Sequence, residues 1–186
     1  MKIHSVSMKG FGPYRGTETV DFDTFRDEGL FVITGKTGAG KTSILDAITF
    51  ALFGDVPRYG SVTDDSIRSK YLGDSPEETR VDLEFSQGDK RYRVSRIPTY
   101  TKPGNKNPTQ TWAEIAEVNP DGTEKVIASR KVNEVAKAVT GIVQLNAAQF
   151  KQVILLAQGA FQDFLLAKSD DRRALLRRLF NSTRFD

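Results

Sequence analysis

The stretch GKTGAGKTS, residues 35–43, is the strongest indication of fold in this sequence. It fits the pattern G-x-x-x-x-G-K-[ST] at every fixed position. A polyphosphate needs donors on several sides, and backbone N–H groups converge on it only where no bulky side chain intervenes. We therefore predict a phosphate-binding loop whose nucleotide contacts come from Gly35, Lys36, Thr37, Gly38, Ala39, Gly40, Lys41, Thr42 and Ser43.

Two side chains of this loop are expected to contact the phosphates or the metal ion. Lys41 is expected to reach the β- and γ-phosphates, and the Thr42 hydroxyl to ligate Mg²⁺. The flanks fit a strand–loop–helix unit. LFVITG, residues 30–35, is apolar up to Thr34 and predicts a strand buried on both faces. TSILDAITFALFG, residues 42–54, predicts an amphipathic helix that ends at Gly54 and points its positive end at the anion.

The remaining sequence predicts an α/β fold. Alternating apolar residues indicate two short strands in 2–10 and 16–22, joined through a turn at Gly12-Pro13. They also indicate a hairpin of 80–85 with 91–97, and a second of 110–118 with 124–129 around Asn119-Pro120-Asp121-Gly122. Helices are expected from Ser129 to Gly141, from Asn146 onward and from Ser169 onward.

The composition is that of an ordinary globular chain. It has 186 residues, of which 38% are hydrophobic and 27% charged, and it contains no cysteine. No apolar run is long enough to cross a bilayer, and the first residues lack a signal-peptide pattern. We therefore expect a cytoplasmic protein without membrane contact. The net charge of +3 is too small to indicate a nucleic-acid partner by itself.

A catalytic carboxylate is missing from the sequence pattern. Most P-loop enzymes place Asp or Asp-Glu at the end of a second apolar strand, where it holds Mg²⁺ and orients water. Here the apolar run VILLAQ, residues 153–158, ends in Gln158, and VDLEF, residues 81–85, alternates and turns its acids outward. The chain thus supplies a phosphate cradle without the usual acid.

Three stretches together carry a resemblance to a known family. They are MKIHSVSMKGFGPYRGTETVDF (1–22), GKTGAGKTSILDAITFALFG (35–54) and FKQVILLAQGAFQDFLL (150–166). In this order and spacing the chain resembles the N-terminal ATPase lobe of the SbcC family, the SMC-like ATPase subunit of the SbcCD nuclease.

The resemblance implies a P-loop NTPase fold of the ABC-type ATPase head. The N-terminal lobe, residues 1–168, would combine an antiparallel subsheet with a central parallel sheet and flanking helices, and residues 169–186 would begin a coiled coil. In this family a C-terminal lobe of the same protein carries the signature motif, the acidic Walker B strand and a switch histidine. The head is then incomplete without that lobe.

The resemblance also implies cofactors, catalytic residues and partners. The cofactors are ATP and Mg²⁺. Gln158 matches the Q-loop glutamine, which contacts the metal and the attacking water, so Lys41 and Gln158 are the expected catalytic residues and Thr42 and Gln158 the metal ligands. ATP binding would join two heads as a homodimer. The partners would be an SbcD-type nuclease and double-stranded DNA ends, in a nucleoid-associated complex for DNA repair and recombination.

Two basic regions have an additional DNA or partner interpretation. Arg91, Arg93, Lys102 and Lys106 lie on or near an outward strand face and could follow a DNA backbone, or they could form a solvated face. The arginines of DDRRALLRRLFNSTRFD, residues 170–186, fit the root of the coiled coil near the nuclease, or a helix that docks on its own domain.

Two alternatives from other functional classes stay open at this point. The first is a stand-alone P-loop nucleotide kinase or NTPase, which would need an acceptor site and lid arginines within this chain. The second is a DNA-binding scaffold module that uses ATP only structurally.

Overall fold

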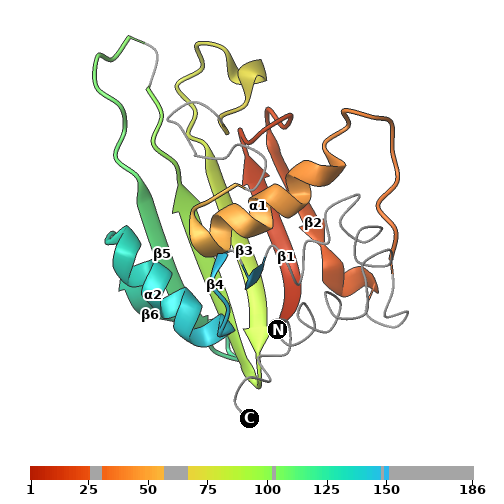
Figure 1. Cartoon of the computed structure of the whole chain (residues 1–186), viewed down its shortest axis with the longest axis vertical. Helices are drawn as coiled ribbons and strands as arrows, with labels where there is room; N and C mark the ends of the chain where they lie inside the picture. Colours follow the sequence, from red (N-terminus) through yellow and green to blue (C-terminus); the bar gives the residue numbers. More distant parts are fainter. Residues whose placement is uncertain (26–30, 57–66, 102–103, 148, 151–186) are drawn as a thin grey trace, which may run out of the picture. The chain divides into compact units, whose positions relative to one another are not determined.

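A six-stranded antiparallel sheet organises residues 1–144, and two helices lie across one of its faces (Figure 1). The computed structural model describes residues 1–25, 31–56, 67–101, 104–147 and 149–150. The chain divides into two units, residues 1–144 and 145–186. The expected domain boundary after residue 168 and the Gln158 site lie outside the described residues.

The sheet has the order β2-β1-β3-β4-β5-β6, and every neighbouring pair is antiparallel. Both predicted hairpins and the opening pair of strands are confirmed. The elements of the described chain are β1 (Lys2–Lys9), β2 (Thr17–Asp21), η1 (Phe22–Phe25), α1 (Lys41–Phe53), η3 (Lys70–Leu72), β3 (Arg80–Gln87), β4 (Lys90–Ile97), β5 (Trp112–Val118), β6 (Glu124–Ser129) and α2 (Val132–Val143).

The core forms between the sheet and its two helices. Helix α1 packs on β1, β3 and β4, and α2 packs on β5 and β6. Because side chains alternate along a strand, every second residue enters this layer. The fully buried apolar residues of the sheet are Val6, Met8, Val81, Leu83, Phe85, Val94, Ala113 and Ile115.

Helix α1 is buried more completely than an amphipathic helix. Nine of its 13 residues are buried, and they include the polar Ser43, Asp46 and Thr49. The expectation of a helix with one solvent-exposed face was therefore wrong, because α1 packs against α2 as well as against the sheet. Its predicted end is confirmed: Gly54 adopts the left-handed conformation with φ 71° and donates its N–H to the Phe50 carbonyl.

The bounds of α2 differ from the prediction at both ends. Ser129 belongs to β6, where its hydroxyl donates to Glu114 on β5 at 2.7 Å, so the helix begins after Lys131. Gly141 does not end the helix, which continues to Val143 with Gln144 in the left-handed conformation. Val135, Val139 and Val143 form one buried stripe, and this packing outweighs the roughly 1 kcal/mol cost of an internal glycine.

The buried strand expected at residues 30–35 is not formed in its described part, residues 31–35. Phe31, Val32 and Ile33 lie outside any strand and are 44%, 79% and 37% exposed. A strand buried on both faces requires hydrogen-bonded neighbours and cover on each side. In the part of the chain that the structure describes, no strand runs beside these residues, and all strand pairs are antiparallel. The central parallel sheet thus stays a prediction.

The second unit is described only near its start. Asn146 accepts the Gln149 N–H on its side chain, and the Gln149 side chain accepts the Asn146 N–H, both at 2.9 Å. This reciprocal pair is a capping box, and it confirms Asn146 as a helix start. No helix within the described residues is both long enough and apolar enough to cross a membrane.

A buried arginine fixes the far end of α1. Arg96 on β4 is 1% exposed, and its guanidinium donates to the carbonyls of Ala51 at 2.6 Å and Leu52 at 3.1 Å. Burial lowers the pKa of Arg96 to about 10, so the side chain remains a cation at neutral pH. A cation on the last carbonyls of a helix is favoured by the helix dipole.

We predict that Arg96→Met lowers the free energy of unfolding by roughly 2–4 kcal/mol, because buried carbonyls lose a charged donor while the aliphatic stem remains. Urea denaturation of the chain measures this loss. Arg15→Met, at an exposed position before β2, is the matched control and should change stability by less than about 0.5 kcal/mol. Equal stability of both variants would contradict a structural role of Arg96.

Candidate nucleotide-binding site

The predicted phosphate loop lies immediately before α1 and is open to solvent. Residues 35–39 are exposed and Gly40 is partly exposed. Gly38 and Gly40 adopt φ 85° and 97°, a backbone conformation that favours glycine over any residue with a side chain. The loop thereby turns sharply into the helix, as the motif predicts.

Lys41 extends back over the loop that it follows. Its ammonium group donates to the carbonyls of Gly35 at 2.7 Å and Lys36 at 2.9 Å. An ammonium group has three N–H donors, so these two bonds leave one for a phosphate oxygen. The two carbonyls hold the positive charge at the loop, where the pattern predicts that the β- and γ-phosphates bind.

The N-terminus of α1 has no cap from the described residues. Gly40 is the N-cap residue and makes no side-chain cap bond, and the first turn contains no acidic residue. Within the described part of the chain, no hydrogen bond uses the N–H groups of Gly40, Lys41 or Thr42. Unsatisfied N–H groups at a helix start attract an anion, and the helix dipole adds to the attraction.

The other predicted site residues have different surroundings. Thr42 is exposed next to the loop, so its hydroxyl is accessible to a metal ion. Ser43 is 5% exposed, and a β-carbon built on Gly12 would lie 3.5 Å from its hydroxyl, so Ser43 faces the β1–β2 turn. Gln158 lies outside the described residues, and its role stays a prediction.

Tyr14 is a site residue that the sequence pattern did not reveal. It lies in the β1–β2 turn, and its hydroxyl donates to the Gly40 carbonyl at 3.0 Å. A β-carbon at Gly40 would lie 2.6 Å from the Tyr14 hydroxyl oxygen and 2.9 Å from a Pro13 carbon. The last glycine of the loop is thus required by the turn as well as by its own φ. The only local sign was the GPYR turn sequence at residues 12–15.

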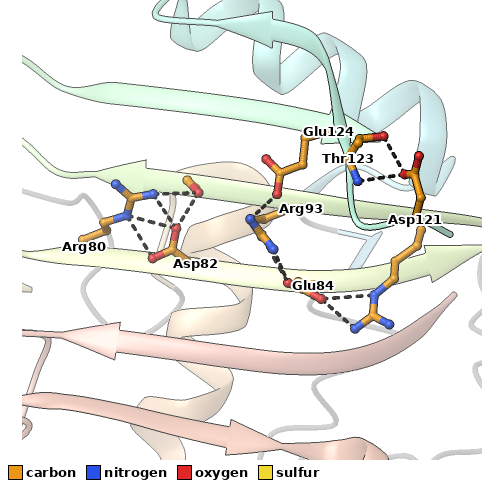
Figure 2. Close-up of polar contacts among 9 residues, drawn as sticks. Arg80, Asp82, Glu84, Arg93, Asp121, Thr123 and Glu124 are labelled. Carbon is orange, nitrogen blue, oxygen red and sulfur yellow. Dashed lines mark hydrogen bonds and ion pairs between the residues drawn. The ribbon is translucent and has the colours of Figure 1, made fainter. Parts of the chain in front are cut away.

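Arg93 lies with Glu84 on the face of the sheet opposite the helices (Figure 2), and Arg91, two residues earlier on β4, shares this face because side chains alternate along a strand. Both arginines with a predicted DNA role are paired with acids. Arg91 and Arg93 both donate to Glu84, at shortest distances of 2.6 and 2.7 Å, and Arg93 also pairs with Glu124. The predicted outward orientation is confirmed. A DNA phosphate would have to compete with Glu84 for both guanidinium groups. Lys106 is exposed, and Lys102 lies outside the described residues.

Opposing effects act on the Glu84 carboxyl. Partial burial raises its pKa. The hydrogen bonds from Arg93 and Arg91 and their positive charges together lower the pKa by more than burial raises it, so it lies below its ordinary value of 4.5. The carboxylate is therefore charged at neutral pH, and it holds the two arginines side by side.

Comparisons with known proteins agree with the loop geometry. A family model described as an AAA domain matches residues 5–184. The SbcC subunit of the SbcCD nuclease of Vibrio cholerae is 39% identical over 188 residues, which cover 98% of this chain and 18% of that protein. The SbcC protein of Staphylococcus saprophyticus is 36% identical over 186 residues, with 100% and 18% covered. That of Staphylococcus haemolyticus is 34% identical over 187 residues, with the same coverage.

The family match, together with a loop that fits the predicted phosphate-binding pattern, defines an ATPase-type domain of the AAA class. Within that class the chain belongs to the SbcC family, as the resemblance of its three sequence stretches indicated. The chain spans about a fifth of the length of these relatives, since it covers 18% of each.

We predict that Gly40→Ala weakens triphosphate binding at least tenfold, about 1.4 kcal/mol or more, because the β-carbon both strains a left-handed residue and collides with Tyr14. Calorimetric titration with a non-hydrolysable nucleoside triphosphate and Mg²⁺ measures the change. Gly16→Ala is the matched control, since nothing lies within 4 Å of a β-carbon at Gly16. Unchanged binding by Gly40→Ala would refute the loop assignment.

We also predict that Glu84 makes stability depend on acid pH. Its pKa is lower in the folded chain than in the unfolded chain, so its contribution is complete above about pH 4.5 and is lost as the pH falls through the folded value. Glu84→Gln should therefore show a flatter fall in the free energy of unfolding below that pH. Asp89→Asn, which removes one exposed carboxyl from the β3–β4 turn, is the control. Identical slopes for wild type and Glu84→Gln would show that the pairing is not stabilising.

Proposed function

We propose that this chain is the ATP-binding half of a split ATPase that controls a DNA-processing nuclease. The observation that carries the proposal is the combination of Lys41, held at the loop by two carbonyls, with the uncapped start of α1. Both features supply positive charge and donors at one place, which suits the triphosphate of ATP. Mg²⁺ would be held by Thr42 and Gln158 and would neutralise phosphate charge when bound.

Hydrolysis in this proposal requires groups from beyond the chain. The sequence offers Gln158 at the end of its apolar run and no acidic strand end. Without a carboxylate to orient the attacking water, the phosphate loop binds a nucleotide far better than it cleaves it. We infer that the C-terminal lobe of the same protein supplies the acidic strand. A second head would supply the signature motif across the ATP-bound dimer.

The exposed apolar residues before the loop support the same division of the ATPase between this chain and a C-terminal lobe. Phe31, Val32 and Ile33 form a strand-like apolar run, yet each is more than a third exposed. Phe31 has partial cover, with its ring 5.4 Å from Phe22 and 5.6 Å from Phe25. An apolar segment of strand-forming residues gains most from burial between two neighbouring strands. The C-terminal lobe would supply those strands and thus complete the central parallel sheet.

The assigned partners follow from the family and from the names of the relatives. The matched relatives are named as the SbcC subunit of the SbcCD nuclease, so a nuclease subunit and double-stranded DNA ends are the proposed partners of the whole protein. ATP binding would close two heads on the DNA, and hydrolysis would release them. The DNA contact would have to involve more than Arg91 and Arg93, because Glu84 neutralises part of their charge.

We predict that the chain alone binds ATP but hydrolyses it slowly, and that the C-terminal lobe raises turnover by at least a hundredfold, about 2.7 kcal/mol in barrier height. Phosphate release from Mg·ATP measures the rate for the chain, for the reconstituted head and for the full-length protein. Lys41→Ala in the full-length protein should abolish turnover, whereas Lys125→Ala, on exposed β6, is the matched control.

Fast turnover by the chain alone would refute the split site and favour the stand-alone P-loop enzyme. Normal DNA affinity and repair activity of the Lys41→Ala full-length protein would favour the scaffold module instead.

A further inference from the structure

Tyr14 forms a hydrogen bond at the junction between the predicted phosphate loop and α1. Its hydroxyl donates to the Gly40 carbonyl at 3.0 Å, and the same carbonyl accepts the N–H of Ser43 at 2.8 Å and of Ile44 at 3.3 Å. Gly40 thus closes the first helical turn and at the same time bonds to a residue 26 positions earlier in the chain. The junction of loop and helix is therefore tied to the β1–β2 turn.

The β1–β2 turn is itself held on several sides. Gly12 donates its N–H to the Ile67 carbonyl at 2.8 Å. The Gly10 carbonyl accepts the N–H of Ser69 at 2.8 Å and the Thr79 hydroxyl at 3.1 Å. Phe11 is 2% exposed, with its ring 5.9 Å from that of Phe50 on α1. A side chain that projects from this turn therefore has a rigid base.

The loop, by contrast, has few bonds of its own. Residues 36–39 are exposed, and the backbone bond within them runs from the Ala39 N–H to the Lys36 carbonyl at 3.1 Å. A segment with so few contacts loses conformational entropy when a ligand orders it, and this loss subtracts from affinity. A bond that fixes one end of the loop before the ligand arrives reduces the loss.

We propose that Tyr14 is a positioning residue of the phosphate site: by donating to the Gly40 carbonyl it holds the loop–helix junction in the conformation that presents the N–H groups of Gly40, Lys41 and Thr42 to a triphosphate. This inference rests on the proposed function, because it requires a phosphate ligand. Tyr14 acts through the backbone of the loop, so its contribution is the same whatever base the nucleotide carries.

The experiment compares Tyr14→Phe with wild type in the full-length protein. The substitution removes the hydroxyl and keeps the ring against Gly40. Tyr71→Phe, at a tyrosine that is 69% exposed, is the matched control. Calorimetry measures the Kd of a non-hydrolysable ATP analogue with Mg²⁺ and of inorganic tripolyphosphate, phosphate release gives KM and kcat, and a thermal melt gives Tm.

A neutral hydrogen bond corresponds to a factor of about two to ten in an equilibrium constant. Tyr14→Phe should therefore raise the Kd of both ligands by about that factor, and KM equally. The kcat should remain unchanged, because the loop holds ground state and transition state alike. The Tm should equal that of Tyr71→Phe.

Three results would overturn the inference. Wild-type affinity in Tyr14→Phe would show that the bond does not position the loop. A Tm loss that parallels the loss of affinity would reduce Tyr14 to a purely structural residue. Weaker ATP binding with unchanged tripolyphosphate binding would indicate contact with base or sugar. If the wild-type protein itself bound no ATP, the proposed function would fail first, and this inference with it.

Discussion

The attachment of α1 to the antiparallel sheet at both of its ends is the constraint on which the site depends. At the start of the helix, Tyr14 and Pro13 of the β1–β2 turn leave room only for a glycine at position 40. At the end, Arg96 of β4 binds the carbonyls of Ala51 and Leu52. Between these points the helix is buried, so neither a shift nor a rotation of α1 is possible without breaking core contacts. The position of the phosphate loop is therefore set by the sheet.

The two ends of α1 differ in their hydrogen-bond partners, and this difference has a physical consequence. The C-terminal carbonyls of α1 are satisfied by a buried cation and by the Gly54 cap, while the N–H groups of Gly40, Lys41 and Thr42 have no acceptor among the described residues. A helix end without partners is a cost to the folded chain unless water or a ligand supplies them. In α1 this cost arises at the N-terminal end, where the motif predicts an anion. This agrees with a site for a phosphate ligand.

Local signals predicted most of the fold, and contacts between distant residues account for what they missed. Alternation along 80–85 and 91–97 predicted β3 and β4, and the glycine pattern predicted the loop, because both are properties of neighbouring residues. Tyr14 and Arg96 form hydrogen bonds to residues 26 and 45 positions away. Contacts over such distances produce no periodic pattern in the sequence. Ser129 had the composition of a helix cap, but its hydroxyl is used by Glu114 across the sheet. The apolar run at 31–33 has the composition of a strand, but burial also requires neighbouring strands.

The two faces of the sheet accommodate charged side chains in different ways. The helix-bearing face tolerates the buried charge of Arg96, because the carbonyls at the end of α1 replace water around it. On the opposite face, charges of both signs alternate, and Glu84 gathers Arg91 and Arg93 into one cluster. Such a cluster fixes arginines in place at little cost, but it also lowers the positive potential that a DNA backbone senses. A surface meant to bind phosphates by charge alone would not carry this glutamate between its arginines. Any DNA contact made here must therefore depend on the geometry of the cluster, or on basic residues at its margin such as Lys106.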